Sequence, residues 1–192
     1  MKLYLYTYNY DIIQKEGYKS LALLDKTDVF LPRLHVYDKM AGSDKTEDIL
    51  AYLEKTFPGR LRSVCVLVHP APVKEYRHRY LNMLVHCADL LSFDLDRLLR
   101  DDIVEAIYCK DCLATIIDRP CFENIYSVTP NQIDARPYDW DLCCTEKYIQ
   151  YSPWATIKHY FLVLKHGLIP PVYITQEVDH SQQRANLFNP MK

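Results

Sequence analysis

The chain has 192 residues, of which 49% are hydrophobic and 25% charged, and its formal net charge is −2. This length and composition predict a soluble globular domain with a full hydrophobic core. The charge balance excludes the strongly basic surface that duplex nucleic acid requires, so we expect no nucleic-acid partner. Only four glycines are present, which argues against the glycine-rich phosphate loops of Rossmann folds and P-loop enzymes.

No stretch of the sequence approaches the roughly 20 consecutive apolar residues of a membrane-spanning helix, so we expect no membrane partner. Tyr and Thr residues interrupt the apolar run at the N-terminus, and Asp11 follows early, which argues against a secretory signal peptide. The seven cysteines are an odd number for a chain without an export signal. We expect them to be buried thiols of a cytoplasmic protein rather than a disulfide framework.

The N-terminal stretch LYLYTYNYDIIQKEGYKS predicts a strand that runs directly into a short helix. Aromatic and β-branched residues dominate positions 2–8, which favours a strand with Tyr6 on one face. Asn9 is a suitable N-cap for a helix over 10–16, and Gly17 is suited to its C-terminal end. Alternation places Leu3, Leu5 and Thr7 on the opposite face of the strand from Tyr6, and in the helix Ile12 and Ile13 are expected to face inward.

Apolar periodicity predicts several helices farther along the chain. The segment 152–167 is the best bracketed, with Ser152 at the N-cap, Pro153 in the first turn and Gly167 after the last turn. The remaining predicted helices span residues 46–57, 74–92 and 94–102.

Strands and helices are mixed in this chain without regular βαβ alternation. We therefore expect an α+β fold, in which mixed or antiparallel sheets carry flanking helices within a single domain over residues 1–178. The polar residues 179–192 are predicted to form a flexible C-terminal tail. Short apolar runs predict the other strands, at 28–37, 62–70, 103–109, 122–128 and 168–178.

The N-terminal stretch and the later phrase GLIPPVYIT, residues 167–175, resemble segments of ADP-ribosyltransferase-like domains. In that family the first strand often reads LYHYT or LYHGT; here Leu5 stands where the family has its His or Arg, so Tyr4 or Tyr6 would have to replace it. The resemblance implies a transferase that uses NAD as its substrate and modifies a protein or another macromolecule. It also implies a possible toxin or effector, secreted into a host cell without a classical signal peptide.

The resemblance implies a nicotinamide pocket at the first strand and the turn that follows it. Tyr6 and Thr7 would contact the nicotinamide ribose, and Tyr10 or Tyr18 would stack on the flat ring. In RLHVYD, His35 and Tyr37 are either a surface-facing polar row or a wall of the pocket facing the Tyr6 strand.

Cleavage of the N-glycosidic bond of NAD passes through an oxocarbenium-like sugar, which a nearby carboxylate stabilises. Glu105, on a predicted strand, and Glu177, after the last strand, are the candidates for this carboxylate. His159 would fall near the family's glutamate if HYFLVL were a strand instead of a helix.

Two alternatives stay open on the residues alone. The 16 tyrosines are suited to a non-enzymatic protein-interaction module, because Tyr supplies large contact area at low entropic cost. A zinc-stabilised adaptor would use Cys109 and Cys112 with Cys121 and the pair Cys143 and Cys144. We expect structural thiols and no metal there, because adjacent cysteines chelate one ion poorly.

Overall fold

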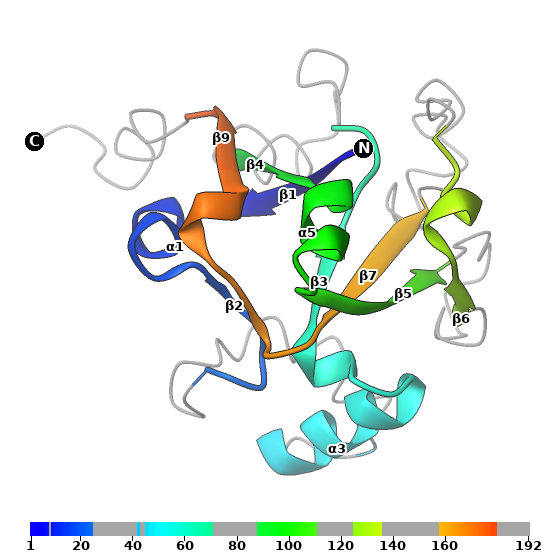
Figure 1. Cartoon of the computed structure of the whole chain (residues 1–192). Coiled ribbons are helices and arrows are strands. Elements are labelled where there is room, and N and C mark those ends of the chain that lie inside the picture. Colours follow the sequence, from blue (N-terminus) through cyan, green and yellow to red (C-terminus); the bar gives the residue numbers. More distant parts are fainter. Residues whose placement is uncertain are drawn as a thin grey trace, which may run out of the picture.

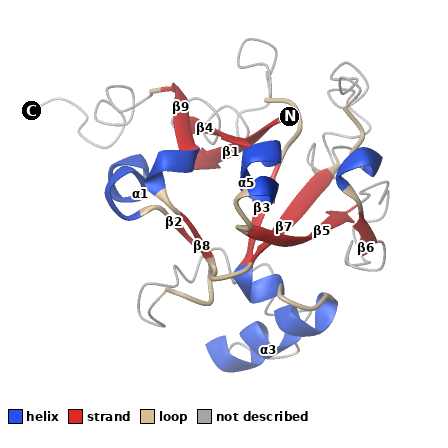
Figure 2. Ribbon diagram, in the orientation of Figure 1, coloured by secondary structure: helices blue, strands red, loops and turns tan. Residues whose placement is uncertain are grey.

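The protein is described by a computed structural model, and it combines short helices with antiparallel sheets, so the predicted α+β class is confirmed (Figures 1 and 2). No helix in the described part of the chain is long and apolar enough to cross a membrane. The residues that the structure describes are 1–7, 9–24, 42, 45–70, 88–110, 125–135 and 158–179.

The predicted N-terminal strand is confirmed as β1 (Lys2–Thr7). It forms a three-stranded antiparallel sheet with β4 (Asp89–Asp94) and β9 (Ile174–Val178), in the order β1-β4-β9. β4 is therefore the central strand, and side chains that project from its two faces lie between those of β1 and β9.

A second antiparallel sheet has four strands in the order β3-β7-β5-β6. Its strands are β3 (Ser63–Val66), β7 (His159–Leu164), β5 (Val104–Lys110) and β6 (Ile125–Val128).

Among the described residues, one isolated bridge joins the two sheets. Just beyond β3, Leu67 forms an antiparallel bridge with Tyr4 of β1. The N–H of Tyr4 donates to the carbonyl oxygen of Leu67 at 2.7 Å, and the N–H of Leu67 donates back at 2.8 Å. Residues on one face of both sheets consequently face one shared interior.

Three α-helices are described, of which only the last in the sequence contributes buried side chains to this interior. α1 (Tyr10–Glu16) follows β1, α3 (Thr46–Thr56) precedes β3, and α5 (Leu95–Arg100) follows β4 directly, with Asp94 as its N-cap. Figure 1 shows α5 where the two sheets meet. Short 3-10 turns complete the described elements: η1 (Arg60–Arg62), η3 (Pro130–Gln132) and η5 (Pro171–Tyr173).

One contiguous hydrophobic cluster, which we call the main core, fills the space between α5 and the two sheets. Such burial is the largest favourable contribution to folding. Its buried members include Leu3, Val64, Val66, Phe93, Leu95, Leu98, Ile107, Tyr160, Leu162 and Leu164. A smaller cluster of Phe57, Phe161 and Val163 lies on the other face of the second sheet.

The helix predicted over 152–167 is wrong where the structure describes it, because residues 159–164 form β7. Tyr160 and Leu162 point into the main core, whereas Phe161 and Val163 pack on the other face of the sheet. A strand buried on both faces gives a continuous apolar run that lacks the period-two signature. Gly167 ends this strand in a turn, with φ +69°, rather than a helix.

The helix predicted over 74–92 is wrong at its C-terminal end for the same reason. Residues 89–92 belong to β4, which is buried on both faces: Leu90 is 7% exposed and Leu91 is fully buried. The rest of this segment that was predicted helical, 74–87, lies outside the described residues. Ile12 was expected to face inward but is 57% exposed, while Ile13 is buried.

A short pairing, β2 (Tyr18–Lys19) with β8 (Leu168–Ile169), links the two halves of the chain. Gly17 has φ +82°, and a Cβ atom there would lie 2.4 Å from the carbonyl oxygen of Ile169. Glycine is therefore needed at this position both for its left-handed backbone and for the close approach of another chain segment.

Gly17→Ala should destabilise the protein by about 2–4 kcal/mol, combining left-handed strain of about 1–2 kcal/mol with a steric clash. Gly42→Ala is the control, because Gly42 also has a positive φ (+68°) but no described atom lies within 4 Å of its added Cβ. Urea denaturation measures both. Equal losses for the two variants would show that the contact with Ile169 is unimportant.

Candidate functional site

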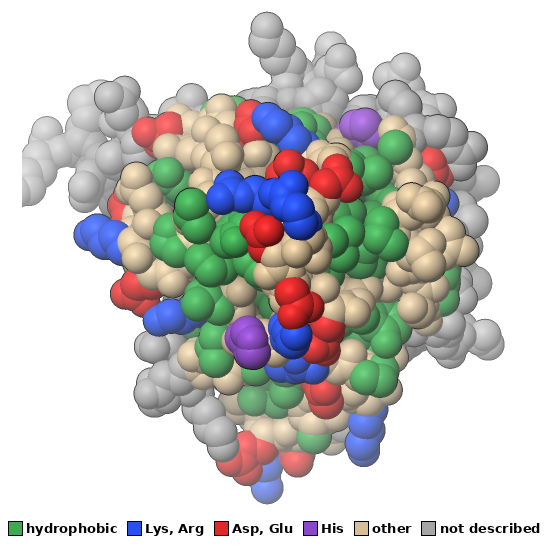
Figure 3. All heavy atoms as spheres, viewed as in Figure 1, with side chains coloured by type: hydrophobic (Ala, Val, Ile, Leu, Met, Phe, Trp, Pro, Cys, Tyr) green, Lys and Arg blue, Asp and Glu red, His purple; other side chains and the backbone are tan. Residues whose placement is uncertain are grey.

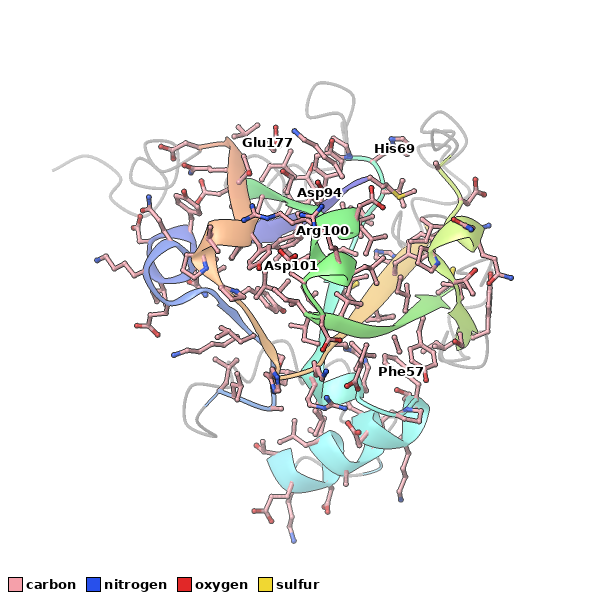
Figure 4. The ribbon with its side chains drawn as sticks, viewed as in Figure 1. Phe57, His69, Asp94, Arg100, Asp101 and Glu177 are labelled. Atoms are coloured by element: carbon pink, nitrogen blue, oxygen red, sulfur yellow. The ribbon has the colours of Figure 1, made fainter. Side chains whose placement is uncertain are left out.

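The face of the first sheet that is turned away from the main core carries a polar cluster. Strand alternation places Tyr4 and Tyr6 on this face, because Leu3 and Leu5 pack against the main core on the other. Ser92 of β4 pairs with Tyr4 on one side and with Thr175 on the other. We call Lys2, Tyr4, Ser92 and Glu177 the Glu177 cluster; Figure 4 shows Glu177 on β9, far from Phe57.

A β-bulge puts Glu177 into this cluster. Leu91 pairs with Gln176, but Leu90 pairs with Val178, so Glu177 is the extra residue on β9. A bulge bends its strand and changes the direction of a side chain, and bulges are frequent beside active sites. The Glu177 side chain consequently reaches across the face of β4.

Both donors in the cluster bind the same oxygen of Glu177. The Lys2 ammonium donates to Oε1 at 2.8 Å, and the Ser92 hydroxyl donates to Oε1 at 2.6 Å. Ser92 is 2% exposed, whereas the side chains of Glu177 and Lys2 are 27% and 59% exposed. Within the described residues, Oε2 accepts no hydrogen bond.

These contacts keep the carboxyl group ionised. The hydrogen bonds from Lys2 and, second, from Ser92 lower the pKa of Glu177 below its usual value. The same ion pair raises the pKa of Lys2. Glu177 is therefore ionised at neutral pH, and Lys2 balances its charge within the cluster. A carboxylate that a ligand can separate from Lys2 is suited to stabilising positive charge in a bound molecule.

The predicted pocket residues Tyr6 and Thr7 point to opposite faces of β1. Tyr6 is half-buried, pairs with Leu90 and shares the face of the Glu177 cluster. Thr7 is 7% exposed, lies opposite the fully buried Asp89, and its Oγ1 accepts a hydrogen bond from the backbone N–H of Asn9 at 3.1 Å. This bond shapes the turn into α1, while the Asn9 side chain makes no capping hydrogen bond.

The two tyrosines predicted to stack on a ligand lie on different parts of the fold. Tyr10 is half-buried at the first position of α1. Tyr18 packs against the main core, on the side of β1 opposite Tyr6. Tyr6 and Tyr18 therefore do not line one wall. His35 and Tyr37 lie outside the described residues.

Glu105, another predicted carboxylate, is engaged in a bidentate ion pair on the second sheet. Arg62 Nη2 lies 2.5 Å from Glu105 Oε1, and Arg62 Nη1 lies 3.1 Å from Oε2. Arg62 Nη1 also donates to the carbonyl oxygen of Lys165 at 2.9 Å, so the pair ties η1 to the end of β7. The pair raises the pKa of Arg62.

The third predicted catalytic residue, His159, opens β7 and faces away from the main core. It pairs with Lys110, at the opposite end of the β5–β7 ladder from Glu105. The structure therefore does not bring Glu105, His159 and Glu177 together. Glu177 alone shares a sheet face with Tyr6.

The start of β9 is fixed by a cluster on α5 and η5. Arg97 lies over the ring of Tyr173 at 4.4 Å, and the Tyr173 hydroxyl donates to Asp101 at 3.0 Å, which raises the pKa of Tyr173. Figure 3 shows acidic and basic side chains side by side on this face of the molecule. Because η5 leads directly into β9, this cluster helps to position Glu177.

The described cysteines fit the expectation of buried thiols. Cys109 is 1% exposed on β5, and Cys65 is half-buried on β3. Within the described ranges, no group of three or more His, Cys, Asp or Glu side chains is placed to hold a metal ion. Cys112, Cys121 and the pair at 143–144 lie outside those ranges.

Sequence reasoning missed Lys2 and Ser92. A serine inside the apolar run DLLSFD was the available signal, since a buried polar side chain usually has a specific hydrogen-bond partner. This signal was missed because residues 74–92 were predicted to be helical. That prediction placed Ser92 at the end of a helix, whereas it lies within the central strand β4.

Glu177→Gln should lower stability by about 1 kcal/mol at pH 7, because the buried Ser92 hydroxyl loses a charged acceptor. The folded-state pKa of Glu177 is lowered, so its contribution is complete above the unfolded pKa, near 4.5, and is lost as the pH falls through the folded-state value. Urea denaturation of both proteins between pH 7 and pH 3 should show the gap closing. A gap that is constant across this range would contradict the assigned ion pair.

The N-terminal segment 3–20 and the segment 167–175 lie side by side in the fold. Tyr18 pairs with Ile169 and Lys19 with Leu168. α1, from the first segment, also contacts η5, from the second. Comparison with family models, curated proteins and solved structures found no match to this chain.

Proposed function

We propose that this protein is an NAD-dependent ADP-ribosyltransferase-like enzyme that modifies a protein or another macromolecule, with Glu177 as the carboxylate beside the nicotinamide ribose. The observation that carries the proposal is the position of Glu177, an ionised carboxylate on the sheet face that carries Tyr4 and Tyr6. Lys2 and Ser92 hold its Oε1, and no other described residue donates a hydrogen bond to the carboxylate. The setting is the cytoplasm of the producing cell or of a host.

Transfer of ADP-ribose from NAD requires a carboxylate beside the ribose. The bond between the ribose C1′ and the nicotinamide nitrogen breaks, its electron pair leaves with nicotinamide, and positive charge develops on the sugar. A fixed carboxylate stabilises that charge. Its attraction to the sugar is stronger in the transition state than in the ground state, so it lowers the barrier. The acceptor nucleophile then bonds to C1′. In this proposal, Oε2 of Glu177 holds a ribose hydroxyl while Oε1 keeps its two donors.

The arrangement of β1 favours Tyr4 and Tyr6 as the residues that replace the family's His or Arg. Leu5, at the family's position, packs against the main core and is turned away from Glu177. The tyrosine hydroxyls can donate hydrogen bonds, and the rings offer flat surfaces to a planar ligand. Pairing of the two resembling segments through β2 and β8 also supports the proposal.

A protein-interaction module is the alternative function. The observation that favours it is the exposure of two large apolar side chains on contacting elements, Ile12 of α1 at 57% and Val172 of η5 at 66%. Clustered apolar exposure is typical of interaction surfaces. Each of the two elements also contains a tyrosine, Tyr10 in α1 and Tyr173 in η5.

Glu177→Gln should reduce the rate of nicotinamide release from NAD by about 100-fold or more, because one charge-stabilising group is removed. Glu105→Gln is the matched control: it removes a carboxylate of the same size that is paired with Arg62 on the other sheet. Nicotinamide is quantified by chromatography, with circular dichroism to verify folding. Loss of activity in Glu105→Gln with retention in Glu177→Gln would reverse the assignment.

Tyr6→Ala should abolish the rise in melting temperature that millimolar NAD produces, because a ligand stabilises only the state that binds it. Tyr126→Ala is the control, since Tyr126 is 46% exposed on β6 of the other sheet. Differential scanning fluorimetry, with and without NAD, measures both. An unchanged response in Tyr6→Ala would remove Tyr6 from the pocket.

A further inference from the structure

We propose that Lys2 is an internal competitor for cationic ligands: its ammonium group holds the position beside Glu177 that the positive charge of the nicotinamide ring of NAD would take. This inference rests on the proposed function and adds a regulatory element to the same site. The Lys2 Nζ and the ligand's cationic group would both be attracted to the Glu177 carboxylate, and the structure places Lys2 within 2.8 Å of Oε1.

The two donors to Oε1 differ in how firmly they are held. Ser92 is 2% exposed on the central strand β4, so its hydroxyl keeps its position when a ligand binds. Lys2 is 59% exposed at the end of a flexible four-carbon side chain. Exposed ion pairs are weak, because water and salt screen them and long side chains lose freedom on pairing. A ligand cation can therefore displace Lys2 while Ser92 continues to orient the carboxylate.

The proposal makes the effect of Lys2 depend on the charge of the ligand. Oxidised NAD carries a positive nicotinamide ring, which repels the ammonium group and competes with it for Glu177. NADH has nearly the same shape but a neutral ring, so it gains nothing from displacing Lys2. A lysine that instead contacted the phosphates of the dinucleotide would favour both forms equally, because both carry the same phosphates.

The test measures dissociation constants of NAD and NADH by calorimetry for the full chain and for its Lys2→Met and Lys2→Arg variants. Lys2→Met should bind NAD roughly twofold to fivefold more tightly than the unmodified protein, as expected for the loss of one exposed competing charge, with NADH binding unchanged. Lys2→Arg keeps the charge and should behave as the unmodified protein does. Melting temperatures of the variants establish that they are folded.

Two other outcomes would overturn the inference and leave the proposed function intact. Weaker binding of both NAD and NADH to Lys2→Met would show that Lys2 holds the phosphates. Equal affinities for NAD in Lys2→Met and the unmodified protein would show that Lys2 does not compete. If NAD binds to none of the three proteins, the proposed function itself fails, and the inference fails with it.

Discussion

The backbone pair between Tyr4 and Leu67 is the constraint on which the rest of the structure depends. Its two hydrogen bonds, at 2.7 and 2.8 Å, join the β1-β4-β9 sheet to the β3-β7-β5-β6 sheet. Because opposed residues of an antiparallel pair share a face, this bridge directs Leu3 and Val66 into one main core. Tyr4 and Tyr6 consequently lie on the outer face of the first sheet, which is the face turned away from the main core and the one that carries the Glu177 side chain. The same contact therefore sets both the packing of the fold and the composition of the candidate site.

Local chemistry made parts of the fold predictable from the sequence. Patterns among neighbouring residues predict the alternation in β1. They also predict the buried stripe of α3, which consists of Ile49 and Leu53 in the helix and Phe57 just after it. β7 could not be predicted in this way. Its apolar run is buried from both sides by elements far apart in the sequence, and the surrounding Ser, Pro and Gly residues fit the ends of a helix equally well. The segment forms a strand because it pairs with β3 and β5, which are distant in the sequence.

The candidate site was predictable only in its individual members. The resemblance named Tyr6 and Glu177, but it gave no reason to prefer Glu177 over Glu105. That distinction depends on partners: Arg62 binds both oxygens of Glu105, whereas the hydrogen bonds from Lys2 and Ser92 both go to one oxygen of Glu177. Lys2 and Glu177 are 175 positions apart, and the contact exists because of strand register and a bulge, neither of which a sequence pattern encodes.

In the proposed function, the outer face of the β1-β4-β9 sheet binds the nicotinamide ribose of NAD at Glu177. A crystal structure of the protein soaked with NAD tests it most directly. The account predicts a ribose hydroxyl within hydrogen-bond distance of Glu177 Oε2, with Ser92 still donating to Oε1 and the nicotinamide ring against Tyr4 or Tyr6. Electron density for NAD elsewhere on the molecule, with Glu177 unchanged and free of ligand, would contradict it.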